Sequence, residues 1–372
     1  MSSSDHVKQS VIVAMSGGVD SSVAALILSR EGRAKAALTM RLSDDVPAAS
    51  SQGRCCAVRD IRDARMVAAS LGLPHYVLDL RERFAAEVMR PFALDYLAGR
   101  TPIPCIACND RIKFDDLAQR ARALGAERVA TGHYARLGRD GTTHVLLRAH
   151  DREKDQTYFL HGLSQEQLAA AEFPLGGLSK DEVRALAREA GLSTSDKPES
   201  QEICFVPDGN VAAFVEREAE ALGASAQPGT FIDSDGVRVG AHGGVHGFTV
   251  GQRKGLGAHG QPHYVLEIRA ESAEVVIGPA ESLGFSGLEV SRFHWIAGKP
   301  AGPVDGEVQV RHARRAQAAR ITPRGEGALI ELAAVERAIS PGQAAVVYQG
   351  DVVLGGGAIT TAHRMARSRT GS

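Results

Sequence analysis

A glycine-rich turn between an apolar run and an amphipathic stretch constrains the fold of this chain more than any other feature. Residues 11–15 are apolar, Ser16-Gly17-Gly18-Val19-Asp20-Ser21-Ser22 follows, and Val23, Leu26 and Ile27 then recur at helical spacing. This pattern predicts a strand, a tight turn and a helix. Backbone N–H groups at such a helix start bind anions, and glycine lets a phosphate approach the backbone. The alternative is a tight turn whose serines only cap the helix.

The residues after this turn continue the alternation of strands and helices. Segments typical of strands are residues 36–42, 75–80 and 128–131. Apolar stripes with helical period occupy residues 61–71 and 112–124. We therefore expect an α/β domain over residues 1–205, with a parallel sheet covered by helices on both faces.

The second half of the chain is typical of β structure. One further helix is expected at residues 210–222, and Asp233-Ser234-Asp235-Gly236 has the residues of a hairpin turn. Short strands are then expected at residues 307–310, 328–332, 344–348 and 351–354. These patterns predict a small central β-rich domain over residues 206–280 and a C-terminal β-barrel over residues 281–372.

The charge and the start of the chain limit its partners and location. The chain has 372 residues and a formal net charge of -1, so a polyanionic partner must be held by local basic patches. Residues 1–10 lack the apolar core of a secretory signal, and no run approaches the roughly 20 apolar residues of a membrane span. We expect a cytoplasmic protein without membrane contact.

The residues of the turn separate it from the common nucleotide loops. It matches neither G-x-x-x-x-G-K-[ST] nor G-x-G-x-x-G. It resembles instead the PP-loop of the ATP pyrophosphatases, which split ATP between its α and β phosphates. The resemblance implies that the loop holds the leaving pyrophosphate, and that Asp20 helps to hold the magnesium-bound phosphates.

The cysteines favour thiol chemistry over a disulfide framework. They number five, an odd count in a chain without an export signal. Two of them lie in the loop Thr101-Pro102-Ile103-Pro104-Cys105-Ile106-Ala107-Cys108-Asn109, which leads into Arg111 and Lys113. A helix N-terminus and basic side chains favour the thiolate form of a nearby cysteine. Cys204 is the expected second participant.

Two other roles for the cysteines are open on the residues alone. Cys105-x-x-Cys108 could be half of a zinc or iron–sulfur site, although the sequence has no second C-x-x-C. Cys55 and Cys56 are adjacent and awkward as a chelating pair, so burial is the favoured interpretation for them.

Several motifs together resemble those of the bacterial tRNA-specific 2-thiouridylases, the MnmA/TrmU family, nearly from end to end. The motifs are SGGVDSS, the C-x-x-C-N loop, residues 197–205 (KPESQEICF), residues 130–135 (ATGHYA), residues 154–160 (KDQTYFL), residues 250–257 (VGQRKGLG), Pro341-Gly342-Gln343 and Leu354-Gly355-Gly356-Gly357.

The resemblance implies a reaction and its participants. ATP would adenylate the C2 oxygen of a wobble uridine in tRNA, and sulfur would then displace AMP to give 2-thiouridine. Cys204 would receive a persulfide from a sulfur donor such as a cysteine desulfurase or a relay protein. Cys108 would assist transfer of the sulfur, and the two cysteines could pair transiently as a disulfide.

The resemblance also implies binding residues. Those for ATP are Ala14, Met15, Ser16, Gly17, Gly18, Val19, Asp20, Ser21, Met40 and Gly132. Those for tRNA are Ile103, Pro104, Cys105, His133, Lys154, Asp155, Gln156, Arg311, His312 and Gln343. Residues 311–324 carry five arginines and no acid, enough for phosphate contacts. On the residues alone, core packing is as plausible for Met40, a structural role is the commoner one for a lone histidine such as His133, and a solvated turn is favoured at residues 154–156. A solvated barrel face is also possible for the arginine-rich stretch.

Some positions depart from the family pattern. Ile103 stands where asparagine is frequent, and Cys105 stands where some members have aspartate, so Cys105 is interpreted as pocket lining. Residues 41–43 replace the frequent Lys-Asn-Trp, and His312 replaces a common tyrosine, which removes one stacking surface.

Two other functions remain as alternatives. One is another PP-loop adenylating enzyme, which would lack this cysteine pair or add a further domain. The other is a non-catalytic, metal-stabilised RNA-binding protein that uses Cys105 and Cys108. Bound zinc would favour the second alternative, and tRNA-dependent release of AMP from ATP would exclude it.

Overall fold

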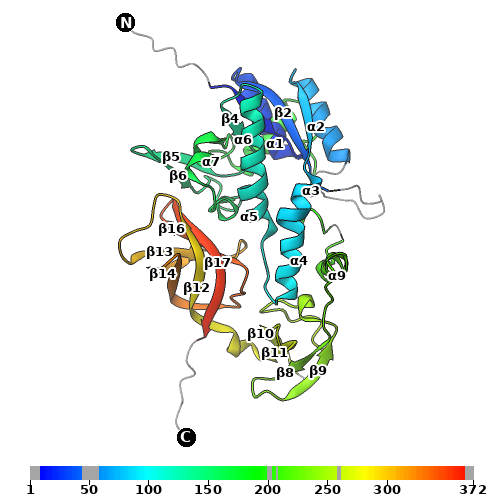
Figure 1. Cartoon of the computed structure of the whole chain (residues 1–372). Coiled ribbons are helices and arrows are strands. Elements are labelled where there is room, and N and C mark those ends of the chain that lie inside the picture. The colour runs from blue at the N-terminus through cyan, green and yellow to red at the C-terminus, as the bar shows by residue number, and fades with distance from the viewer. Residues whose placement is uncertain (1–8, 44–57, 199–202, 207, 258–260, 365–372) are drawn as a thin grey trace. The chain divides into compact units, whose positions relative to one another are not determined.

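A computed structural model describes residues 9–43, 58–198, 203–206, 208–257 and 261–364. The chain forms two compact units (Figure 1). The first contains Met1–Val88 and Cys105–Gly209, and the second contains Met89–Pro104 and Asn210–Ser372. In the described part of the chain, every helix is too short or too polar to cross a membrane.

The first unit is built on a parallel sheet of five strands in the order β3-β2-β1-β4-β7. The strands are β1 (Val11–Ala14), β2 (Ala34–Arg41), β3 (His75–Asp79), β4 (Arg128–Ala130) and β7 (Ala171–Glu172). The chain extends the sheet outward from β1 to β3, then returns to the other side of β1 with β4. In such a sheet ligands bind where the order reverses, at the carboxyl ends of the strands. Here that place is the end of β1 and β4.

The helices of this unit lie on the sheet and in its connections. Helices α1 (Val19–Arg30), α2 (Val58–Ser70), α6 (Phe114–Ala123) and α7 (Gln165–Ala170) contact its strands, and α8 (Lys180–Glu189) packs on α1. Helices α3 (Arg81–Phe84) and α5 (Pro104–Cys108) belong to the connections between strands. Shorter pieces are η2 (Ala85–Met89), η3 (Asn109–Lys113) and η4 (Thr157–Phe159), of which η2 and η3 are π-helical. A hairpin, β5 (Arg136–Asp140) with β6 (Thr143–Leu147), completes this part of the chain.

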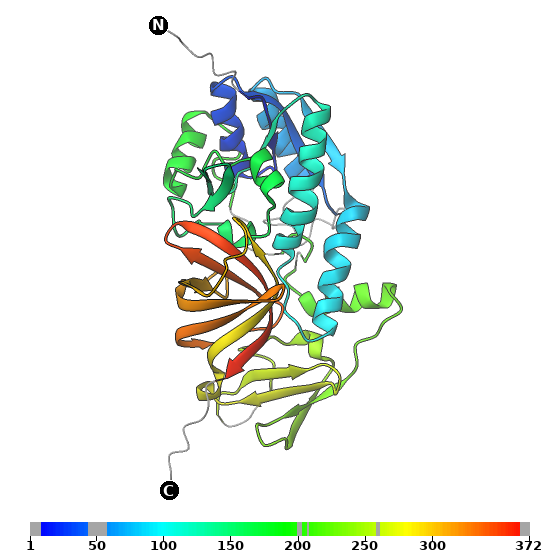
Figure 2. The ribbon, with the colours of Figure 1, turned by 60° about the vertical axis from the view of Figure 1, so that its left-hand side comes forward.

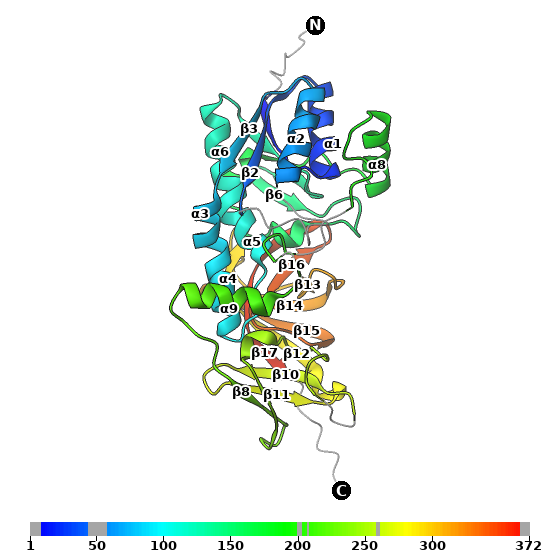
Figure 3. The ribbon, with the colours of Figure 1, turned by 90° about the vertical axis from the view of Figure 1, so that its right-hand side faces the viewer.

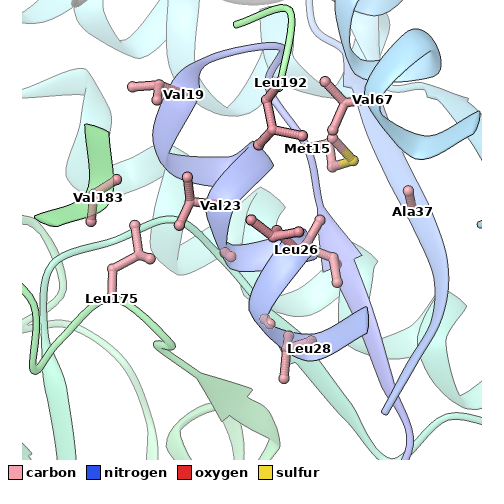
Figure 4. Packing of buried hydrophobic residues seen from close by; sticks show 14 of the residues in the cluster. Met15, Val19, Val23, Leu26, Leu28, Ala37, Val67, Leu175, Val183 and Leu192 are labelled. Atoms are coloured by element: carbon pink, nitrogen blue, oxygen red, sulfur yellow. The ribbon is translucent and has the colours of Figure 1, made fainter. Parts of the chain in front are cut away.

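The core of the first unit surrounds α1, which contacts both α2 and α8. Val23 of α1 faces Leu175 and Val183, and Met15 lies near Val67 of α2 (Figure 4). Because it is enclosed in this way, α1 buries eight of its twelve residues. This burial fixes the helix whose first turn adjoins the glycine loop.

The described part of the second unit includes a pair of crossing helices and a small mixed sheet. Helices α4 (Arg90–Leu97) and α9 (Val211–Ala221) cross, with the rings of Phe92 and Phe214 5.9 Å apart (Figure 3). The sheet has the order β10-β11-β8-β9. Its strands are β8 (Gly229–Ile232), β9 (Arg238–His242), β10 (Tyr264–Arg269) and β11 (Glu274–Gly278), with the short helices η5 (Val245–Gly247) and η6 (Ala280–Leu283). The hairpin turn expected at residues 233–236 joins β8 to β9 and is confirmed.

The same unit ends in a closed barrel (Figure 2). Its strands pair in the order β12-β15-β14-β13-β16-β17, and a further pairing of β12 with β17 closes the ring. They are β12 (Gly284–Trp295), β13 (Val304–Gln309), β14 (Gln317–Arg324), β15 (Gly327–Arg337), β16 (Ala344–Gln349) and β17 (Val352–Arg364). Buried aliphatic side chains such as Leu288, Ile321 and Val347 fill the interior. The predicted fold class, a parallel α/β sheet followed by β-rich structure and a barrel, is confirmed.

Candidate active site

The glycine loop joins the end of β1 to the start of α1 with a close approach to α2. Gly17 has φ +74°, and a Cβ atom there would lie 2.3 Å from the carbonyl oxygen of Asp60. Gly18 is the N-cap of α1 and makes no side-chain cap, so no side chain covers the first turn from this position. This open helix start, next to a hydroxyl of Ser16, fits the phosphates of a nucleotide.

The serines hold the loop from within. The backbone N–H of Ser16 donates to Oγ of Ser21 at 3.1 Å, and that hydroxyl donates to the carbonyl of Gly18 at 3.2 Å. Ser22 donates to the same carbonyl at 2.8 Å. Ser21 and Ser22 are therefore structural parts of the turn.

Gly132, after β4, lies directly against the start of α1. A Cβ atom at Gly132 would be 2.6 Å from the backbone nitrogen of Ser21 and 2.8 Å from the carbonyl carbon of Asp20. Two segments that the sequence singled out separately thus meet at the point where the sheet order reverses. Only glycine allows this approach, which accounts for a glycine at this position.

Asp20 is bound by two groups from distant parts of the chain. Nζ of Lys180 lies 2.7 and 2.9 Å from its two carboxylate oxygens, and the hydroxyl of Tyr134 donates to Oδ1 at 2.9 Å. Lys180 is buried, whereas 32% of the Asp20 side chain is exposed. Sequence reasoning missed Lys180 as a functional candidate. The capping box of Ser179 and Glu182 marks the helix start that carries it, but no local pattern marks its partner.

Lys197, in the segment that leads to Cys204, reaches the glycine loop. Its Nζ donates to the carbonyl of Gly17 at 2.9 Å and to carboxylate oxygens of Asp60 and Asp63, both at 2.6 Å. Burial alone would lower the pKa of Lys197, but the bonds to the two carboxylates outweigh it and raise the pKa. The lysine is therefore charged at neutral pH.

The remaining residues of the predicted ATP set divide into backbone and core positions. Met15 and Val19 are buried in the core cluster, so only their backbone faces the loop. Met40, on β2, is 8% exposed and belongs to the core as well. Ala14 ends β1.

Cys108 and Cys204 both lie in the first compact unit, together with the glycine loop. Cys108 is buried at the end of α5, whereas Cys105 in the same helix is exposed and Cys204 is half-buried. The ring of Phe205, next to Cys204, packs edge-on against that of Phe84, with the ring centroids 5.6 Å apart. Cys55 and Cys56 lie outside the described residues. Among the described residues, no group of three or more His, Cys, Asp or Glu could hold a metal ion.

The π-helical turn after Cys108 carries two polar side chains, of which Asn109 is buried and Asp110 is half-buried. Asn109 donates from Nδ2 to the carbonyl of Phe159 at 2.9 Å. Asp110 packs against Gly162, and its Oδ1 has no hydrogen-bond partner among the residues described. Burial raises the pKa of Asp110 to about 7; Arg111 opposes this shift and Asp115 adds to it.

His133 follows Gly132 and is held as a neutral ring. Its Nδ1 lies 2.7 Å from Oγ1 of Thr131, and its ring lies among those of Phe114 and Phe173. Burial, with a smaller contribution from Lys113, holds the pKa of His133 well below its usual range. The structural alternative for this residue therefore has direct support.

The segment of Lys154, Asp155 and Gln156 is tied down by the chain itself. Asp155, 6% exposed, accepts from the backbone N–H of Ala149 and Thr157, both at 3.2 Å. Gln156 accepts from the backbone N–H of Tyr134 at 3.0 Å. Two of the residues expected to contact tRNA therefore have structural partners: Asp155 holds its own turn to Ala149, and Gln156 holds the loop that carries Tyr134.

Arg311 and Gln343, also expected to contact tRNA, make contacts inside the second unit. Arg311 donates from one nitrogen to the carbonyls of Val250 and Ala338. Gln343 donates to the carbonyl of Thr101 at 2.7 Å.

The other residues expected to contact tRNA on this unit are more accessible. His312 is exposed, and Ile103 and Pro104 are half-buried. Acids on neighbouring strands partly neutralise the arginine-rich stretch. Nη1 of Arg320 lies 3.1 Å from Oδ1 of Asp305, and Nε of Arg314 lies 4.0 Å from Oε1 of Glu336.

Comparison with known proteins agrees with this architecture. Residues 9–208 match a family model described as the tRNA methyl transferase HUP domain, residues 219–279 match its PRC-barrel domain, and residues 285–359 match an aminomethyltransferase beta-barrel domain. The tRNA-specific 2-thiouridylase MnmA of Solibacter usitatus is 46% identical, covering 94% of this chain and 99% of its own. That of Methylorubrum populi is 47% identical, covering 94% and 93%. The chain belongs to the MnmA family.

Solved structures give a weaker likeness. An NH3-dependent NAD synthetase from Campylobacter jejuni has a TM-score of 0.33 at 19% identity and covers 51% of this chain and 67% of its own. A 4-thiouridine synthetase in an RNA complex with bound ATP has a TM-score of 0.32 at 16% identity and covers 59% and 52%. Scores this low support no inference about the site of this MnmA family member.

Proposed function

We propose that this protein is a tRNA 2-thiouridylase, a sulfurtransferase that converts the wobble uridine of tRNA to 2-thiouridine with consumption of ATP. The observation that carries the proposal is that one compact unit combines a glycine loop at the start of a helix with Cys108 and Cys204. Membership of the MnmA family over 94% of the chain supports the same reaction. AMP and pyrophosphate are the other products.

The glycine loop is the proposed site for ATP. The open start of α1 would face the phosphates, and Gly132 brings the end of β4 to the same place. Asp20 would hold Mg²⁺, whose preferred ligands are carboxylate and phosphate oxygens, and the partly exposed carboxylate fits this role. The ion would neutralise charge on the phosphates. Lys180 adds a positive charge that the loop sequence itself lacks.

The two cysteines are the proposed sulfur-transfer residues. Cys204 would carry the persulfide, because it is half-buried and accessible to a donor, and Cys108 is buried beside a π-helical turn. Attack of the Cys108 thiolate on the Sγ of Cys204 would release hydrosulfide and leave a disulfide. The hydrosulfide would displace AMP from C2 of the adenylated uridine, and an external thiol would reduce the disulfide.

The remaining assignments follow from this reaction. Residues 1–205 are assigned to catalysis, residues 206–280 to a central domain and residues 281–372 to tRNA binding. The sulfur donor would be a persulfide protein such as a cysteine desulfurase or a relay protein. A cytoplasmic location goes with tRNA and ATP as substrates.

Mass spectrometry of tRNA nucleosides tests the proposal. Purified protein is incubated with tRNA, ATP, Mg²⁺ and a persulfide donor, and 2-thiouridine is expected at the wobble position. Cys108→Ser and Cys204→Ser should each abolish the product while ATP binding persists. Full thiolation by either variant would refute the roles of these cysteines. A methylated uridine instead would support the reaction named by the family model.

A further inference from the structure

The ammonium group of Lys197 connects three parts of the first unit. Its three hydrogen bonds go to Gly17, Asp60 and Asp63. A lysine has three N–H donors, so these bonds use all of them. In this arrangement Lys197 does not face a phosphate directly. We call these four residues the Lys197 anchor.

The two acids of the anchor are placed by one helix. Asp60 and Asp63 are three residues apart on α2, so their side chains lie on the same face. Asp60 is 4% exposed, and its Oδ2 has no hydrogen-bond partner within the described part of the chain. A buried carboxylate in this state requires a nearby positive charge, and Lys197 is the group that supplies it.

The bond to Gly17 fixes the direction of the glycine loop. A trans peptide points its C=O and the following N–H to opposite sides. The carbonyl of Gly17 is held by Lys197, and a Cβ atom at Gly17 would collide with the carbonyl oxygen of Asp60. The N–H of Gly18 must therefore point away from the anchor. An N–H group at the cap of α1 is the kind of donor that binds a phosphate.

Lys197 also lies seven positions before Cys204 in the sequence, and residues 199–202 between them lie outside the described residues. We propose that Lys197 is a positioning residue that orients the glycine loop for ATP and couples the bound nucleotide to the segment carrying Cys204. This inference rests on the proposed function of that loop and that cysteine. Because coupling between two sites is reciprocal, ATP should change the accessibility of Cys204 through the anchor.

Two measurements on the full-length protein without tRNA test the coupling. The first is the dissociation constant for ATP with Mg²⁺. The second is the rate at which iodoacetamide alkylates Cys204, followed by peptide mass spectrometry with and without ATP. Cys105, in the same digest, serves as an internal reference because it is exposed.

Lys197→Met should weaken ATP binding by about tenfold or more, since it removes a charged donor from the loop. It should also abolish the effect of ATP on alkylation of Cys204, which in the unmodified protein should be about twofold or more. Arg33→Met is the matched control. It breaks another partly buried ion pair of this unit, that of Arg33 with Glu172 at 2.6 Å, without touching the loop. Its ATP binding and its alkylation response should be unchanged.

Asp63→Asn keeps Lys197 and removes one of its partners, so it tests the anchor if Lys197→Met does not fold. It should weaken ATP binding several-fold. Wild-type ATP affinity in Lys197→Met or Asp63→Asn, an equal loss in Arg33→Met, or alkylation of Cys204 that never responds to ATP would each overturn the coupling. Formation of 2-thiouridine is measured separately. Its absence together with Lys197-dependent ATP binding would refute the thiouridylase function and leave the anchor in place.

Discussion

Lys180 holds the carboxylate of Asp20 with its ammonium group 2.7 and 2.9 Å from the two oxygens. The two residues are 160 positions apart, at the first turns of α8 and α1. The lysine is buried and the aspartate is partly exposed, so solvent reaches the ion pair from the side of the carboxylate. A metal ion that binds Asp20 must compete with this ammonium group, and the displaced lysine is then available to a phosphate.

Lys180→Met should separate these two effects. Adenylation should slow by about 100-fold, because a positioned charge is lost from the reacting phosphates. The Mg²⁺ concentration for half-maximal AMP formation should fall, because the metal no longer competes with the lysine for Asp20. The measurement is AMP release at a series of Mg²⁺ concentrations. Arg30→Met, at the exposed end of α1, is the control, and an unchanged Mg²⁺ dependence in Lys180→Met would count against the competition.

Gly132→Ala should disrupt the nucleotide loop without changing any charge. The added methyl group would lie 2.6 Å from the backbone nitrogen of Ser21, so α1 or the loop after β4 must shift. We expect about 1–3 kcal/mol of destabilisation, the usual cost of overpacking, and a loss of ATP affinity of about tenfold or more. Thermal unfolding and equilibrium binding of ATP measure the two effects.

The control for this substitution is Gly177→Ala. A Cβ atom at Gly177 meets nothing within 4 Å, so this variant should match the unmodified protein in both assays. If Gly132→Ala bound ATP normally, the packing of Gly132 on α1 would have no part in forming the site.

Asp110 should give the protein a pH-dependent stability. Its pKa is raised from 3.8 to about 7, so the folded state binds a proton that the unfolded state releases between these values. Stability is therefore favoured at low pH and falls as pH rises from about 4 to 7, by up to a few kcal/mol. Asp110→Asn should flatten this part of the profile. Thermal unfolding between pH 5 and 8 measures it, and an equally steep loss in the variant would assign the dependence to other groups.

Sequence patterns predicted the helices and strands well where the spacing of apolar residues was regular. The strand expected at residues 75–80 is His75–Asp79, and the helix expected at residues 210–222 is Val211–Ala221. The strand expected at residues 351–354 is instead Val352–Arg364. Because of its glycines, the sequence pattern did not indicate the rest of this strand. The same glycines allow β17 to approach β12 closely. A Cβ atom at Gly355 would lie 1.9 Å from the carbonyl oxygen of His294.

The candidate site was predictable only where its chemistry lies in one short segment. The glycine loop and Cys108 could be found because their neighbours form motifs. Lys180 and Lys197 could not be assigned roles, because their partners lie far away in the sequence. Lys180 contacts Asp20, 160 positions away, and Lys197 contacts Gly17, 180 positions away. Gln343 shows the opposite limit. The family motif indicates a tRNA contact, but the side chain has a partner within the protein.

Gln343→Ala should therefore affect the fold more than RNA affinity. The amide of Gln343 donates to the carbonyl of Thr101, and the backbone N–H of Thr101 donates to Pro341 at 2.8 Å. Loss of the amide should cost about 1 kcal/mol of stability, the net value of such a bond, and leave the dissociation constant for tRNA within about twofold. Thermal unfolding and filter binding are the measurements, and Gln349→Ala, an exposed position at the end of β16, is the control. A large loss of tRNA affinity at unchanged stability would show that Gln343 contacts the RNA itself.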